Sequence, residues 1–131
     1  MAEVCLIDTS AWIDFFRGQN PVAAAVDAVL ADGSAALCGM VELEVRQGLR
    51  PSEDDLLELL QATLRLPTRE ADFGKAGALL AGLRRRGITL PATDGLIAQI
   101  ALSQGVQLLE NDKHFAEIAG LKCHPWRETQ A

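Results

Sequence analysis

The sequence predicts an α/β domain in which a short parallel sheet of four or five strands is flanked by helices. Short runs of consecutive apolar residues recur along the chain without alternating with polar residues, as expected of strands buried on both faces. Segments with helical spacing of apolar residues separate these runs. No linker rich in glycine, serine or proline divides the chain, so residues 1–131 are expected to form one domain.

The opening residues predict a strand followed by two helices. Residues 4–7 are four consecutive apolar residues and form the first strand. Thr9 or Ser10 can cap a helix over residues 11–16. A second helix is expected over residues 22–31, where small and aliphatic residues share one helical face.

The middle of the chain predicts a second and a third strand with two helices between them. Residues 35–38 form the second strand. A helix over residues 40–49 ends before Pro51, because the residue that precedes a proline disfavours helical geometry. A further helix covers residues 53–60, and the third strand covers residues 64–66.

The last part of the chain repeats the same alternation. A long helix over residues 70–86 carries aliphatic residues at helical spacing and is followed by a helix over residues 93–103. The fourth strand covers residues 106–109. A helical turn over residues 115–119 then precedes a last short strand over residues 121–124.

Composition limits the classes of function that fit. No stretch approaches the ~20 apolar residues of a membrane span, and Asp8 interrupts the first apolar run, so we expect no secretory signal and no membrane partner. Three widely spaced cysteines indicate reduced thiols and a cytoplasmic protein. The net charge of −6 argues against a protein that coats nucleic acid, but not against a nuclease whose acids bind cations.

Acidic residues are expected to gather at the carboxyl edge of the sheet, where ligands bind in parallel α/β folds. Asp8 directly follows the first strand and Asp112 follows the fourth. Asp94 opens a helix, and its first turn can point the carboxylate toward the same edge. In the segment VELEVRQG we favour Glu44 as the buried acid, because Glu42 stands four residues before an arginine, as in solvated helical pairs.

Carboxylates that converge in one place repel one another and raise one another's pKa values. A hard divalent cation removes this conflict, since Mg²⁺ prefers oxygen ligands. Carboxylate-bound metal ions commonly supply the activated water for phosphodiester cleavage. The acidic pattern therefore predicts a magnesium site that serves a nuclease.

Three segments of the sequence resemble the PIN-domain ribonucleases, and the VapC toxins of toxin–antitoxin pairs in particular. They are LIDTSAWIDFFRG (6–18), VELEVRQGL (41–49) and the stretch from LRRRGITLPATDG to FAEIAGL (83–121). Carried over position by position, the family's acidic set falls on Asp8, Glu44, Asp94 and Asp112. The resemblance agrees with the choice of Glu44 made from the residues alone.

The resemblance implies a PIN-like three-layer α/β/α fold and an endoribonuclease that depends on Mg²⁺ or Mn²⁺. It also implies a homodimer and a small cognate VapB-like antitoxin that blocks the active site. RNA is the implied substrate, with transfer RNA as one target class that the family suggests. A PIN-like domain that binds RNA or a protein without cleaving it is the alternative.

Several further residues are candidates for the site. Where the family commonly has Thr or Ser two residues before the last aspartate, this chain has Glu110, which is either a fifth acidic ligand or points away. Thr9 and Ser10 can either cap the following helix or form a hydrogen bond with Asp8 or with a metal-bound water. For Asp14 the alternatives are an ion pair with Arg17 and a place in the site.

Basic residues are candidates for contact with RNA phosphates, against the simpler reading that they are solvated cations near helix ends. These are Arg46, Arg84 and Arg85.

Overall fold

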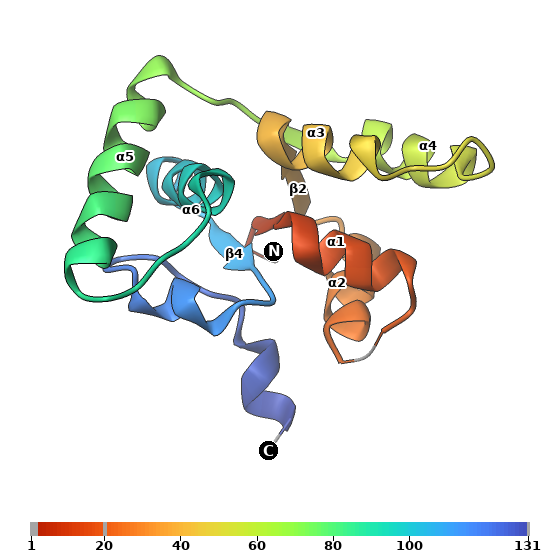
Figure 1. Cartoon of the computed structure of the whole chain (residues 1–131). Coiled ribbons are helices and arrows are strands. Elements are labelled where there is room, and N and C mark those ends of the chain that lie inside the picture. The colour runs from red at the N-terminus through yellow and green to blue at the C-terminus, as the bar shows by residue number, and fades with distance from the viewer. Residues whose placement is uncertain (1–2, 20, 131) are drawn as a thin grey trace.

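The structure, a computed structural model, describes residues 3–19 and 21–130 and confirms the α/β architecture with a parallel sheet (Figure 1). The described residues form four strands: β1 (Cys5–Ile7), β2 (Ala35–Cys38), β3 (Leu64–Leu66) and β4 (Gln107–Leu109). They pair in the order β3-β2-β1-β4, and every pair is parallel. The first strand along the chain is therefore central, and the carboxyl ends of all four strands share one edge.

Continuous apolar strands form here because the sheet has no solvated face at its centre. Every residue of β1 and β2 is buried. Leu6 lies between Ala36 of β2 and Leu108 of β4 in the register of the sheet. The edge strand β3 is different, since Leu64 and Arg65 are exposed, as is usual at a sheet edge.

Six α-helices flank the sheet in the described part of the chain, in the three-layer arrangement expected. They are α1 (Thr9–Phe16), α2 (Val22–Ala31), α3 (Gly39–Gln47), α4 (Asp54–Ala62), α5 (Glu70–Arg85) and α6 (Ala92–Gln104). Each matches a predicted helix to within two residues at either end. None of the described helices is long and apolar enough to cross a membrane.

Helix α6 is largely buried and packs closely against α5. Its residues from Gly95 to Ala101 are all buried, so it lacks a solvated face along this stretch. Gly95 permits this close approach, because a Cβ atom there would lie 2.5 Å from Cγ of Leu80 on α5 and would force the Leu80 side chain to move. Gly105 ends the helix in the left-handed conformation, with φ of 66°.

Two local expectations were wrong. Asp8, and not Thr9 or Ser10, caps α1, because its carboxylate accepts a hydrogen bond from the backbone N–H of Ala11 at 2.8 Å. The last expected strand is reduced to a single bridge between Leu108 and Cys123, because the chain leaves the sheet after one pairing.

The end of the chain is built from two 3₁₀ helices. The turn expected at residues 115–119 is η1 (Lys113–Glu117), which begins two residues earlier because Asp112 caps it. The second, η2 (Pro125–Gln130), was not expected from the sequence.

Candidate active site

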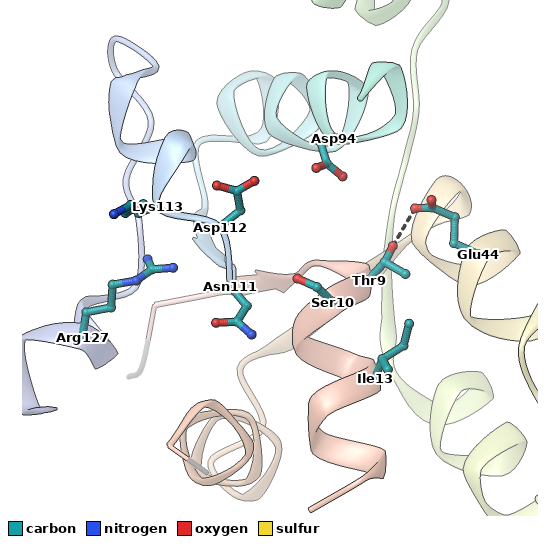
Figure 2. A pocket seen from close by; sticks show the side chains of 9 residues that line it. All are labelled: Thr9, Ser10, Ile13, Glu44, Asp94, Asn111, Asp112, Lys113 and Arg127. Carbon is teal, nitrogen blue, oxygen red and sulfur yellow. Dashed lines mark hydrogen bonds between the residues drawn. The ribbon is translucent and has the colours of Figure 1, made fainter. Parts of the chain in front are cut away.

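An open pocket of about 680 Å³ lies at the carboxyl edge of the sheet and is lined by three carboxylates from distant parts of the chain (Figure 2). Glu44 comes from α3, Asp94 from the first turn of α6, and Asp112 from the loop after β4. Thr9 and Ser10, at the start of α1, line the same pocket. The topology thus brings together three of the four acids selected from the sequence.

Asp8, the fourth acid, is buried at the end of β1, where only 3% of the residue is exposed. Its carboxylate accepts hydrogen bonds from the Ala11 N–H at 2.8 Å and from the Ser10 hydroxyl at 3.0 and 3.1 Å. The pKa of Asp8 is nevertheless raised to about 7, mainly because of burial; the negative charges of Asp94 and Glu110 contribute to the increase, and the two hydrogen-bond partners oppose it.

Asp94 carries a second raised pKa, at about 6. Loss of contact with water is the main cause, and the nearby charges of Glu44 and Asp112 add to it. In Figure 2 its carboxylate points from α6 into the space between Asp112 and Thr9. A cation placed between these groups would favour the ionised form of each.

The two glutamates of α3 separate as expected, with one difference. Glu42 forms ion pairs with Arg46 at 2.8 Å and with Arg65 at 2.5 Å, and the hydrogen bond from Arg65 is the largest cause of its lowered pKa. Glu44 faces the pocket and accepts a hydrogen bond from the Thr9 hydroxyl at 2.6 Å. Glu44 is half-buried, whereas the sequence predicted a buried acid. The difference arises because the side chain faces the open pocket.

Glu110 does not line the pocket. The residue is fully buried, and one carboxylate oxygen forms an ion pair with Arg127 of η2. The other oxygen accepts a hydrogen bond from the backbone N–H of Asp112 at 3.1 Å. The charge of Glu110 is thus balanced by Arg127, whereas no ion pair among the described residues balances the charge of Asp8, and this favours the second of the two readings of Glu110.

The remaining candidates are distributed unevenly around the pocket. Asp14 lies outside it and accepts a hydrogen bond from Asn111, and no ion pair with Arg17 is seen among the described residues. Arg84 and Arg85, which occupy the exposed last turn of α5, do not line the pocket.

Arg127 and Lys113 line the pocket, and the sequence reasoning missed both. One indirect argument could have pointed to Arg127. If Glu110 is buried, its carboxylate requires a cationic or hydrogen-bonding partner somewhere in the chain. No spacing rule connects residues 110 and 127, so the sequence does not identify that partner. Lys113 follows Asp112 directly and had no signal of its own.

The site suits a hard divalent cation by donor type and by charge. Its acidic residues offer only oxygen ligands, and burial and mutual repulsion raise the pKa of two of them. No three His, Cys, Asp or Glu side chains in the described ranges lie close enough to hold an ion by themselves. Mg²⁺ does not require such a cage, because it keeps several waters and shares ligands with substrate phosphates.

The fold and the pocket together define an α/β domain that gathers acidic side chains at the carboxyl edge of a parallel sheet. A family model described as the PIN domain matches residues 5–121. VapC ribonuclease Mb1587 of Mycobacterium bovis and ribonuclease VapC11 of Mycobacterium tuberculosis are each 34% identical to this chain over 121 residues, which cover 87% of this chain and 90% of theirs. The chain belongs to the PIN-domain family and, within it, groups with the VapC ribonucleases.

Solved structures show the same fold at lower identity. VapBC2 from Rickettsia felis, bound to a DNA fragment from its promoter, matches with a TM-score of 0.74 and 17% identity over 92% of this chain and 97% of that one. DNA-bound VapBC from Salmonella typhimurium matches with a TM-score of 0.66 and 17% identity, over 95% and 99% of the two chains.

Proposed function

We propose that this protein is a divalent-metal-dependent endoribonuclease that acts as the toxin of a toxin–antitoxin pair. The observation that supports this most directly is the meeting of Glu44, Asp94 and Asp112 in one pocket, which is also lined by Thr9 and Ser10, the residues that follow the buried Asp8. The relatives named ribonuclease, at 34% identity over most of both chains, support the same activity.

Each acid is assigned a role. Asp8, Asp94 and Asp112, together with bound water, would hold the first Mg²⁺ or Mn²⁺, and Glu44 would help to hold a second ion or orient a water molecule. When bound, the ion would supply an acidified water and neutralise charge on the phosphate under attack. The chain contributes orientation: Thr9 fixes Glu44 through its hydroxyl, while Ser10 and the Ala11 N–H fix the carboxylate of Asp8.

The proposed partners follow from the relatives. The neighbouring structures from Rickettsia felis and Salmonella typhimurium are VapBC proteins bound to DNA, so a VapB-like antitoxin is the expected protein partner here. RNA is the proposed substrate, with transfer RNA as one target class. A homodimer and a cytoplasmic location complete the proposal.

Cleavage of total cellular RNA by the purified protein tests the proposal. We expect new 5′ ends in Mg²⁺ and none in EDTA, and we expect Asp94→Asn to lower the cleavage rate at least about a hundredfold, since a metal ligand is lost. The matched control is Asp27→Asn, which changes an exposed acid on α2 and should cleave like the wild type. A wild-type protein that binds RNA in Mg²⁺ and yields no fragments would instead support the non-cleaving alternative.

A further inference from the structure

Arg127 brings a positive charge to the pocket that three carboxylates line. In Figure 2 its side chain extends from η2 toward the loop that carries Asn111 and Asp112. The Arg127 side chain remains 37% exposed, although its partner Glu110 is only 1% exposed. The guanidinium of Arg127 is thus paired with a buried carboxylate and is still accessible from the pocket.

Two neighbours hold the guanidinium in place. One N–H group of Nη1 donates to the Glu110 carboxylate. The centroid of the Trp126 ring lies 4.7 Å from Cζ of Arg127. The indole N–H of Trp126 donates to the backbone carbonyl of Glu110 at 2.9 Å, which ties η2 to the end of β4. A guanidinium has five N–H groups, and among the described side chains Glu110 is the one acceptor found for them.

We infer that Arg127 contacts a backbone phosphate of RNA bound in this pocket and that Glu110 is its positioning residue. RNA is a polyanion, and it meets several carboxylates here, so a fixed cation beside them lowers the repulsion. A guanidinium suits phosphate because it offers parallel N–H donors in a planar fork. The inference rests on the proposed action on RNA.

This assignment also explains why a glutamate occupies position 110. A fully buried carboxylate is tolerated only with a charged or hydrogen-bonding partner, and Arg127 and the Asp112 N–H supply both. The same pair fixes the loop of Asp112 and the guanidinium relative to each other. Glu110 therefore acts through Arg127 and not as a ligand.

The decisive variant is the double substitution Glu110→Gln with Arg127→Gln. It removes the pair without changing the net charge and without leaving a buried charge alone. Affinity is measured in EDTA, where no cleavage is expected, with a fluorescein-labelled single-stranded RNA of mixed sequence. We expect about tenfold weaker binding and a plot of log affinity against log salt that is shallower by about 0.7.

The matched control is Arg86→Gln with Glu117→Gln. This pair is also an arginine–glutamate ion pair, at 3.0 Å, but it is exposed and does not line the pocket. Wild-type affinity is expected for the control. Equal affinity and equal salt dependence for the Glu110–Arg127 double variant and the wild type would overturn the inference.

Two single variants keep the test valid if the double variant folds poorly. Arg127→Lys keeps the charge but loses the fork, so we expect severalfold weaker binding, and unchanged affinity would contradict the contact. Glu110→Gln should raise KM for RNA more than it lowers kcat, with an unchanged Mg²⁺ requirement. A raised Mg²⁺ requirement with an unchanged KM for RNA would overturn the assignment of Glu110 as the residue that positions Arg127.

The inference and the proposed function fail in different ways. A wild-type protein that binds RNA through Arg127 in EDTA but never cleaves it in Mg²⁺ contradicts the nuclease and supports the contact. A wild-type protein that cleaves RNA, with a double variant that binds and cleaves equally well, contradicts the contact alone.

Discussion

The hydroxyl of Thr9 donates to the carboxylate of Glu44 at 2.6 Å, across 35 residues of sequence. This contact joins the start of α1 to α3 directly at the pocket (Figure 2). It also fixes one acid of the candidate site relative to Asp8, which immediately precedes Thr9. The position of Glu44 therefore depends on a neutral residue that supplies no metal ligand in the proposed scheme.

Replacing Thr9 by valine tests this dependence. The variant keeps the shape of the side chain and loses the hydrogen bond, so we expect the free energy of unfolding to fall by about 1 kcal/mol. RNA cleavage is expected to slow severalfold because Glu44 is no longer held in one orientation. Urea unfolding and a cleavage time course measure the two effects. The control is Thr68→Val, at an exposed position, and equal cleavage by both variants would contradict the role given to Thr9.

The raised pKa of Asp8 predicts a specific dependence of stability on pH. Because the pKa of Asp8 is about 7 in the folded protein and about 4 in an unfolded chain, the folded state binds more protons between these values. The contribution of Asp8 to stability is therefore greatest at low pH and is lost as the pH rises from 4 to 7. Asp8→Asn cannot ionise, yet it retains an oxygen that can cap α1.

Urea unfolding in EDTA at several pH values measures this effect. We expect the free energy of unfolding of Asp8→Asn, relative to the wild type, to increase from pH 4 to pH 7 and to level off above. Asp27→Asn, at an exposed site on α2, should show no such trend in this comparison. If the difference in the free energy of unfolding between Asp8→Asn and the wild type stays constant with pH, the pKa of Asp8 is not raised in the folded protein.

Mg²⁺ is expected to stabilise the protein through the same acids. An ion that binds only the folded state, at about ten times its Kd, adds about 1.4 kcal/mol and raises Tm by roughly 5 °C. EDTA should reverse the increase. Asp94→Asn should reduce it strongly, whereas Asp27→Asn should retain it. An equal increase in Tm for all three proteins would place the bound ion elsewhere, and this measurement needs no RNA.

A side chain at Gly95 is expected to displace Leu80. A Cβ atom there would lie 2.5 Å from Cγ and Cδ1 of Leu80, so Gly95→Ala should lower the free energy of unfolding by about 1–3 kcal/mol. Because Asp94 is the adjacent residue, a displaced α6 should also slow RNA cleavage. Gly74→Ala is the matched control: it has open space in α5 and should stabilise the protein by about 0.5–1 kcal/mol. Restored stability on adding Leu80→Ala to Gly95→Ala would confirm that Leu80 causes the clash.

Much of the fold was determined by local sequence alone. The apolar runs that became β1 and β2 and the periodic segments that became the six helices were evident without coordinates, because burial on both faces and helical packing leave direct patterns in a sequence. The positions of Asp8 and Asp112 after strands predicted a shared edge, since parallel strands place their carboxyl ends together. The family resemblance selected the same acids.

Only the tertiary structure decided which side chains of this site pair with one another. Glu110 was open between a ligand and a residue that points away, and the deciding partner, Arg127, lies 17 residues further along the chain in an unexpected 3₁₀ helix. The cap of α1, the half-buried state of Glu44 and the single bridge at Cys123 were likewise not predicted. The physical reason is the same for each: hydrogen bonds and ion pairs between distant segments depend on orientation and on the space that packing leaves, and neither has a spacing that a sequence displays.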